Sequence, residues 1–210
     1  MYFKLAVCLI PPIAALAADF PSPATNIPAN GSKSATAVLA GGCFWGVEAV
    51  FEHLEGVTDV VSGYAGGSQS TAHYLMVGSG RTGHAESVQI TYDPGKISYG
   101  KLLQIFFAIA HDPTELNRQG PDEGPQYRSV IFYSSPQQKE VAEAYIKQLN
   151  DAKTFRRKIV TQVSALNGFY PAEPEHQDFI ARNPRYPYVV YNDLPKLEQL
   201  RRKYPDLLKH

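Results

Sequence analysis

The segment GGCFWG, residues 41–46, brings a thiol, two large aromatic side chains and three glycines into six positions. An apolar stretch over 36–40 precedes it and apolar residues at helical spacing follow it, so Cys43 is predicted to lie where a buried strand ends and a helix begins. Unpaired backbone N–H groups and the helix dipole favour a thiolate there, so we expect a lowered pKa for Cys43 and a nucleophilic role. The alternative for a lone cysteine is a small buried hydrophobe.

The residues around the thiol allow two interpretations. Phe44 and Trp45 either belong to the core side of the following helix or form an apolar wall beside the sulfur, which would select a small nonpolar group. Gly41 and Gly42 are expected to let a ligand approach the backbone closely, and Gly46 has no packing role of its own. The wall is favoured because other residues already supply the buried stripe of the helix: Val47, Val50, Phe51 and Leu54.

A carboxyl group at the start of an apolar strand is the candidate acid. Glu86 stands in the segment GRTGHAESV, and a carboxyl group buried there without a cationic partner would have a raised pKa and could donate a proton near neutral pH. A solvated charge at the strand end is the alternative. His84 and Glu86 also match the first half of a zinc deaminase signature, but the chain lacks the Cys-x-x-Cys pair that this signature requires, so we expect no metal.

Residues 111–129, HDPTELNRQGPDEGPQYRS, form a long polar stretch between a helical and a strand pattern. Loops of this length are uncommon inside a domain unless they serve a site. This one offers Asp122 and Tyr127 as candidate site residues.

The hydrophobic periodicity predicts the order strand-helix-strand-strand-helix-strand. This order is that of an α+β fold, a two-layer sandwich with a ferredoxin-like split βαβ core, helices on one face and long active-site loops. Ser98 and the pair Ser135-Pro136 are expected to begin helices. The strands are predicted over 36–40, 57–67, 85–93, 127–133 and 158–164, and a short terminal helix over 194–204.

The N-terminus predicts export. Residues 1–17 carry one lysine, an apolar run and the small-x-small site Ala15-Leu16-Ala17, which indicates a signal peptide and a secreted or periplasmic protein. A hydrophobic tail or short membrane anchor is the alternative. Residues 18–35 are rich in Pro, Ser, Asn, Gly and Ala, which indicates a disordered linker before a catalytic domain over 36–210. Basic and acidic residues number 20 each, so nothing in the charge balance suggests nucleic acid or an anionic membrane.

Several motifs together resemble one family, the class A peptide methionine sulfoxide reductases. The similarity covers about 37–187 and implies thiol-dependent reduction of the S epimer of methionine sulfoxide, free or in peptides, through a cysteine sulfenic acid, with no metal or organic cofactor. The motifs that carry it, in order, are GGCFWG, GYAGG, TAHY, GRTGHAESV, YDPGKISY, HDPTELNRQGPDEGPQYRS and EPEHQ.

The resemblance assigns a role to each candidate residue. It implies that Cys43 is the nucleophile and Glu86 the acid, and that Tyr74 and Tyr127 hydrogen-bond the sulfoxide oxygen. The aromatic pair Phe44 and Trp45 would hold the S-methyl group of the substrate. Asp122 corresponds to an aspartate near the substrate in the family.

The chain departs from the family at its C-terminus. Many members carry further cysteines there that attack the sulfenic acid, but the only cysteine besides Cys43 is Cys8, which lies inside the expected signal. We therefore expect no disulfide framework and an external reductant that is thioredoxin-like, glutaredoxin-like or a small thiol. The other expected partners are oxidised methionines in proteins, with no nucleic acid, no membrane in the mature form and a monomeric state.

Two alternatives come from other function classes. A cysteine acyl-transferase or thioesterase would pair Cys43 with a histidine base and leave an acyl adduct on the sulfur. A peptide-binding module would use Trp45 and the tyrosines as an aromatic groove, with Cys43 only structural. The candidate bases are His84, His111 and His176.

Overall fold

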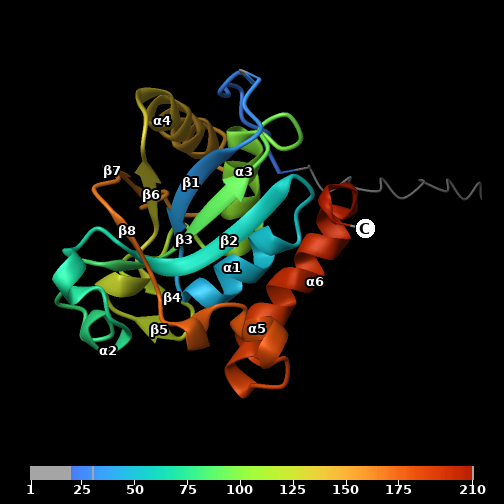
Figure 1. Cartoon of the computed structure of the whole chain (residues 1–210). Helices are drawn as coiled ribbons and strands as arrows, with labels where there is room; N and C mark the ends of the chain where they lie inside the picture. The colour runs from blue at the N-terminus through green and yellow to red at the C-terminus, as the bar shows by residue number, and fades with distance from the viewer. Residues whose placement is uncertain (1–19, 30, 210) are drawn as a thin grey trace, which may run out of the picture.

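A six-stranded sheet with the order β7-β6-β1-β3-β2-β8 forms the centre of the chain (Figure 1). The computed structural model describes residues 20–29 and 31–209, so the expected signal peptide, including Cys8, lies outside the described residues. The sheet strands are β1 (Ala35–Ala40), β2 (Val57–Ala65), β3 (Ala85–Tyr92), β6 (Val130–Tyr133), β7 (Gln162–Ala165) and β8 (Phe169–Pro171), and a separate pair is formed by β4 (Arg118–Gln119) and β5 (Asp122–Glu123).

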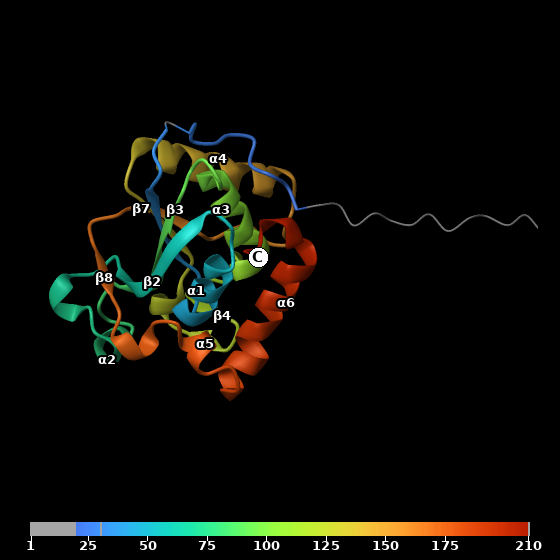
Figure 2. The same cartoon turned by 45° about the vertical axis from the view of Figure 1, so that its right-hand side comes forward.

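Helices cover one face of this sheet and fill the connections between strands (Figures 1 and 2). The α-helices are α1 (Phe44–Glu52), α2 (Tyr74–Val77), α3 (Tyr99–Ile105), α4 (Pro136–Asp151), α5 (Phe179–Arg182) and α6 (Leu194–Lys203). Two π-helical segments, η2 (Phe106–Ala110) and η5 (Val189–Asp193), continue α3 and precede α6. Short 3₁₀ turns are η1 (Gln69–Thr71), η3 (Pro125–Tyr127), η4 (Pro174–His176) and η6 (Pro205–Leu207).

The four central strands confirm the predicted split βαβ core. Neighbours in the order β6-β1-β3-β2 are all antiparallel, and α1 connects β1 to β2 with β3 inserted between them. In this register Leu39 of β1 lies opposite Val88 of β3 and Ile131 of β6. Two further strands extend the core: β7 pairs parallel with β6, and β8 pairs antiparallel with β2.

The sheet curls, because its two outer strands are neighbours in the chain. A flat sheet of six strands would hold β7 and β8 about 24 Å apart, whereas the residues 166–168 between them span at most about 14 Å. The curl encloses a small apolar cluster that also contacts Leu166 and Phe169. Its buried members are Val38, Ala40, Ala65, Ala85, Val130 and Phe132.

Strand β1 supplies both apolar layers. Ala37 and Leu39 belong to the large core between sheet and helices, while Val38 and Ala40 face the inside of the curl. Successive side chains of a strand point to opposite faces of the sheet. Because both faces of β1 are buried, its sequence is apolar at successive positions. The end of β1 is therefore held from both sides where the GGCFWG segment begins.

The helix starts follow the predicted capping residues. The Ser98 hydroxyl accepts a hydrogen bond from the backbone N–H of Lys101 at the start of α3. The Ser135 hydroxyl accepts one from Gln138 at the start of α4, with Pro136 in the first turn. The predicted stripe of α1, from Val47 to Leu54, is buried in the core. Helix α6 packs on the outer side of α1 (Figure 2).

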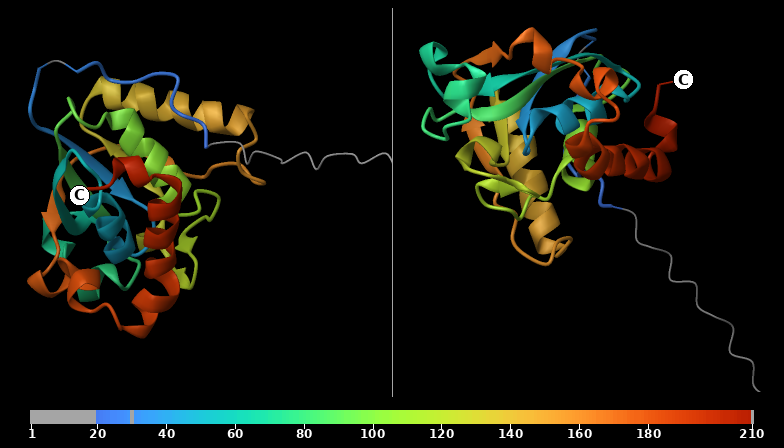
Figure 3. Two further views of the ribbon diagram at one scale, coloured as in Figure 1. Left: turned by 90° about the vertical axis from the view of Figure 1, so that its right-hand side faces the viewer. Right: turned by 90° about the horizontal axis from the view of Figure 1, so that it is seen from below.

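Residues 20–29, within the predicted disordered linker, form no helix or strand and lie along α3 and α4 (Figure 3). The Asn26 side chain donates to the Ser98 hydroxyl and accepts from the backbone N–H of Gly100. The Tyr145 hydroxyl donates to the carbonyl of Pro21. This part of the expected linker thus makes specific contacts with the domain.

The connections at one end of the sheet surround the start of α1. Helices α2 and α5 and the β4–β5 pair all lie at this end (Figures 1 and 3). They belong to the stretches 66–84, 112–129 and 172–188, which are far apart in the sequence. Among the described residues, no helix is both long and apolar enough to cross a membrane.

A buried acid on α1 predicts a pH-dependent stability. Glu48 is 1% exposed, one of its carboxyl oxygens has no hydrogen-bond partner, and burial together with the nearby Glu52 raises its pKa to about 8. Because the folded pKa lies above the unfolded value of 4.5, this group favours folding below about pH 4.5 and loses that contribution as the pH rises towards 8.

We therefore expect Glu48→Gln to change the free energy of unfolding more favourably at pH 8 than at pH 5, by at least about 1 kcal/mol. Urea denaturation at the two pH values measures this difference. The control is Glu140→Gln, which changes an exposed acid on α4 and should show no such difference. Equal effects of Glu48→Gln at both pH values would contradict the assignment.

Candidate active site

At the two glycines before the thiol, the space that a side chain would need is occupied by other side chains of the protein. A Cβ atom at Gly41 would lie 2.9 Å from the rings of His111 and Phe106. Gly42 has a φ of +92°, and its Cβ would lie 2.5 Å from Cγ of Gln119. The prediction that these glycines admit a ligand is therefore wrong: they admit the π-helical end of α3 and the 112–124 loop.

Gly46 packs against the C-terminal segment. A Cβ atom at this position would collide with Oδ1 of Asp193 and would lie 2.8 Å from Nζ of Lys196. Asp193 is fully buried and pairs with Lys196, with 3.2 Å between Oδ1 and Nζ. The expectation that Gly46 has no packing role is wrong, because it lets this ion pair sit on the first turn of α1.

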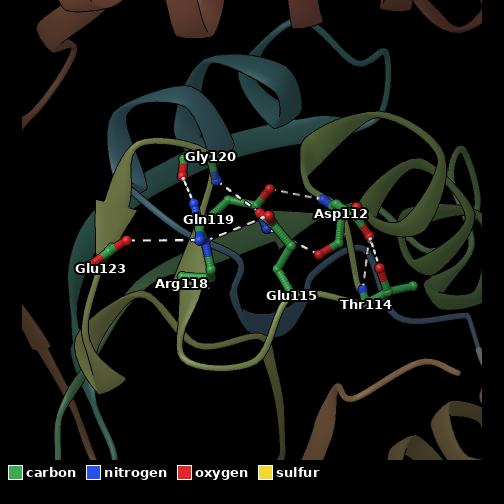
Figure 4. A network of polar contacts seen from close by, with 7 residues as sticks. All are labelled: Asp112, Thr114, Glu115, Arg118, Gln119, Gly120 and Glu123. Atoms are coloured by element: carbon green, nitrogen blue, oxygen red, sulfur yellow. Dashed lines mark hydrogen bonds and ion pairs between the residues drawn. The ribbon is translucent and has the colours of Figure 1, made fainter. Parts of the chain in front are cut away.

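The Gln119 side chain, which fills the space beside Gly42, is held by a network of polar contacts. Figure 4 shows this network. The Gln119 side chain accepts from the backbone N–H of Asp112 and donates to its carbonyl, both at 3.0 Å. Glu115 accepts from the backbone N–H of Gly120. Arg118 adds ion pairs with Glu115 and Glu123. The long polar loop therefore has a defined conformation, and it serves the thiol segment as well as carrying Asp122.

Cys43 and Glu86 meet at the start of α1. Cys43 occupies the position before the first helical residue and is 8% exposed. The backbone N–H of Phe44 donates to Oε2 of Glu86 at 3.1 Å, so the carboxyl group from β3 caps the helix that begins after the thiol. Glu86 is 3% exposed, which rules out the solvated strand-end charge as its environment.

The electrostatics of this pair correct one prediction and support another. Burial raises the pKa of Glu86 to about 8, against the lowering effect of the Phe44 N–H, so this carboxyl group is protonated at neutral pH. Burial, with the negative charges of Glu86 and Asp193, also raises the pKa of Cys43 well above its usual value. The expected lowering is wrong because desolvation and neighbouring carboxylates outweigh the backbone N–H groups at the helix end.

An aromatic cluster surrounds Phe44, which is 1% exposed. Its ring centroid lies 5.9 Å from Tyr64, 6.5 Å from Tyr74 and 5.5 Å from His176. His176 also packs on Tyr74 at 4.1 Å. Phe44 is therefore a core residue that also borders the site, so the two interpretations of this position do not exclude each other.

Trp45 is partly buried and is covered by the C-terminal segment. Its ring stacks on Phe179 with 3.7 Å between centroids and 7° between planes. Tyr186 and Tyr188 meet it edge-on at 6.3 and 6.0 Å. These contacts build an apolar wall next to Cys43 out of residues that are more than 130 positions away in the sequence.

The remaining predicted residues come together around the thiol. Burial and the charges of Glu86, Cys43 and Asp122 raise the pKa of Tyr74 to about 12, and burial with the same charges raises the pKa of Tyr127. Asp122, at the start of β5, accepts a hydrogen bond from the Tyr188 hydroxyl. Both tyrosines therefore remain protonated donors at neutral pH.

Several site residues were not predicted from the sequence. The motif EPEHQ contains Glu173, His176 and Gln177. The sequence suggests a role only for His176, as a candidate base. The several tyrosines within 186–191 could have indicated the aromatic wall. No sequence pattern indicates that Asp193 and Lys196 reach the site. The segment from Phe179 to Lys196 therefore completes the site by tertiary packing alone.

Two of the three candidate bases, His84 and His111, are engaged in hydrogen bonds that hold the fold. One His84 ring nitrogen lies 2.9 Å from the carbonyl of Ser68 and the other accepts from Gly67. His111 contacts the carbonyl of Phe106 and the hydroxyl of Ser129. Within residues 20–29 and 31–209, no cluster of His, Cys, Asp and Glu side chains could hold a metal ion.

The packing of Gly46 gives a testable prediction. We expect Gly46→Ala to destabilise the fold by about 2 kcal/mol, because the added Cβ would displace the buried carboxyl of Asp193. Urea denaturation measures the change. The control is Gly95→Ala, in an exposed turn, which should alter stability by less than about 0.5 kcal/mol. A Gly46→Ala protein as stable as the unchanged chain would refute the packing role.

The interaction between Glu86 and the Cys43 thiol gives a second testable prediction. Cys43 loses its proton above the pKa of Glu86, where Glu86 carries a negative charge that raises the pKa of Cys43. Replacing Glu86 by Gln removes this charge, so the pKa of Cys43 should fall. The pH dependence of iodoacetamide labelling at Cys43, mapped by mass spectrometry, measures it. Glu123→Gln, which changes an exposed carboxylate of β5, is the matched control. An unchanged or raised Cys43 pKa in Glu86→Gln would show that the two groups do not interact.

Comparisons with known proteins agree with this geometry. The family model for peptide methionine sulfoxide reductase matches residues 35–207. A peptide methionine sulfoxide reductase MsrA 2 of Mesorhizobium japonicum is 58% identical over 83% of this chain and 89% of its own length. Another from Synechocystis is 57% identical over 82% of this chain and 81% of its own.

Solved structures show the same fold. Mxr1 from Saccharomyces cerevisiae in reduced form matches with a TM-score of 0.66 and 35% identity, covering 73% of this chain and 88% of that one. Methionine sulfoxide reductase A of Corynebacterium diphtheriae matches with a TM-score of 0.62 and 35% identity, over 75% and 78%. The family that the sequence motifs indicated is therefore confirmed, and this chain belongs to the peptide methionine sulfoxide reductases.

Proposed function

We propose that this protein reduces the S epimer of methionine sulfoxide, free or in oxidised proteins, with Cys43 as the nucleophile. The observation that carries the proposal is that a protonated carboxyl group, Glu86, and an aromatic wall both lie at the helix start that carries the buried thiol. A sulfoxide needs a nucleophile for its sulfur, a proton donor for its oxygen and an apolar surface for its methyl group.

The reaction balances without another reactant. The Cys43 thiol and the sulfoxide give a Cys43 sulfenic acid and a thioether, so the substrate sulfur gains two electrons and the cysteine sulfur loses two. Glu86 passes its proton to the sulfoxide oxygen and receives the proton that leaves the thiol, and the carboxyl group ends as it began. Since both groups are protonated at neutral pH, the resting enzyme already holds the protons that this step needs.

The other residues position the substrate. Tyr74 and Tyr127 donate hydrogen bonds to the sulfoxide oxygen, and their raised pKa values keep them protonated. Phe44 and Trp45 accommodate the S-methyl group, which distinguishes the sulfoxide from larger or more polar groups. Asp122 holds the Tyr188 hydroxyl and so fixes the ring that meets Trp45 edge-on.

We expect a thiol from another molecule to regenerate Cys43. Cys43 is the one cysteine of the described residues, and the C-terminal segment presents Tyr188 and Lys196 to the site. An external thiol attacks the sulfenic acid with loss of water, and a second thiolate then releases Cys43 from the mixed disulfide. The N-terminal sequence supports export, so the donor would be a thioredoxin-like or glutaredoxin-like carrier, or a small thiol, outside the cytosol.

A single-turnover experiment tests the function. Incubation with a peptide S-sulfoxide and no reductant should yield about one equivalent of methionine, and dimedone should then label Cys43, because no other described cysteine can consume the sulfenic acid. Added dithiothreitol should restore turnover.

The control for this experiment is Cys43→Ser, which should form no product because a serine hydroxyl is a far weaker nucleophile. Product from Cys43→Ser, or preferential reduction of the R epimer, would refute the proposal. An acyl adduct on Cys43 after incubation with a thioester would instead indicate an acyl-transferase.

A further inference from the structure

Glu173 lies where β8 ends and connects two parts of the aromatic cluster. Its Oε1 accepts from the backbone N–H of Tyr74 at 2.9 Å, and its Oε2 accepts from the Tyr64 hydroxyl at 2.8 Å. His73 adds a contact of 3.8 Å from Nδ1 to Oε1. One carboxylate thus binds the first residue of α2 and a fully buried tyrosine of β2.

Helix α2 has few other contacts that could fix its position. It is four residues long, Leu75 and Met76 are exposed at 88% and 42%, and only Val77 is buried. A helix of one turn is not stable alone. The orientation of Tyr74 therefore depends on Glu173, which accepts from its backbone N–H, and on the rings of Phe44 and His176, which pack against its ring.

Glu173 is itself held firmly. It follows Ala172, whose backbone N–H donates to the Ser62 carbonyl of β2. The Gln177 side chain accepts from the backbone N–H of Ser62 and donates to the carbonyls of Ser62 and Ala172. It thereby continues the pattern of backbone hydrogen bonds along β2. The Tyr64 ring, the other partner of Glu173, packs on Phe44. The Glu173 carboxylate therefore connects the backbone of Tyr74 to the sheet through Tyr64, whose ring also contacts Phe44 beside Cys43.

We propose that Glu173 is a positioning residue for the reductase step, which sets the backbone of Tyr74 so that its hydroxyl reaches the sulfoxide oxygen. This inference rests on the proposed function. Small displacements of a positioned donor reduce rates strongly, because the hydrogen bond must be formed in the transition state. A carboxylate accepts from both partners, whereas glutamine has one accepting oxygen and an NH₂ group that only donates. In Glu173→Gln the hydrogen bond with the Tyr64 hydroxyl must therefore be reversed or lost.

The test is a double-mutant cycle on single-turnover rates with a peptide S-sulfoxide. Glu173→Gln should slow methionine formation about tenfold, while Glu173→Gln combined with Tyr74→Phe should be no slower than Tyr74→Phe alone. The matched control, Glu175→Gln, removes the same charge two positions along the segment and should keep the unchanged rate.

The outcomes separate this inference from the proposed function. If the unchanged protein forms no methionine, the proposed function fails. If it does, an unchanged rate in Glu173→Gln, or an equal slowing in the Tyr74→Phe background, overturns the positioning role. Should Glu173→Gln not fold, Tyr64→Phe removes only the hydroxyl bond. It should slow the step about threefold, and only when Tyr74 is intact, and no slowing would overturn the role.

Discussion

The hydrogen bond from the backbone N–H of Phe44 to the carboxyl group of Glu86 is the interaction on which the site depends. It links the first turn of α1 to β3 and holds the buried carboxyl group of Glu86 beside the residue that follows Cys43. Because that acid is desolvated, it retains its proton near neutral pH. With one carboxyl oxygen accepting from Phe44, the carboxyl group can still donate its proton to a bound substrate.

The sheet topology makes this contact possible between residues 42 positions apart. Strands β1 and β3 are antiparallel neighbours, so the end of β1, which leads into Cys43, lies beside the start of β3, which carries Glu86. Strand β8 pairs with β2 on the other side, which brings the segment after β8 next to β2. In this way the motifs around Cys43, Glu86 and Glu173 reach one end of the molecule.

Local rules predicted the core strands and the longer helices, but not the short elements α2, α5, β4, β5 and β8. Ser98 and Ser135 cap the helices they were expected to begin, the strand order of the split βαβ core is confirmed, and Glu86 has the raised pKa that its apolar neighbours indicated. These features depend on residues close in sequence or on regular alternation, which a single sequence displays directly.

Effects that depend on distant segments were missed. Burial raises the pKa of Cys43 most, and the charges of Glu86, Asp193 and Asp122, which come from three other parts of the chain, raise it further. The helix end alone indicated a lowered pKa. The glycines 41, 42 and 46 make room for protein side chains that no local pattern identifies. The stacking of Phe179 on Trp45 likewise depends on how the C-terminal segment returns to α1.

The pH dependence of the first turnover tests the central claim most directly. If the reacting state contains both the Glu86 acid and the Cys43 thiol, the rate should be constant between about pH 6 and 7 and should fall about tenfold per unit above about pH 8, where Glu86 loses its proton. In Glu86→Gln the rate should be low and should not show this fall. A rate that rises continuously through pH 9 would contradict the account, because it would mean that a thiolate reacts without a protonated acid.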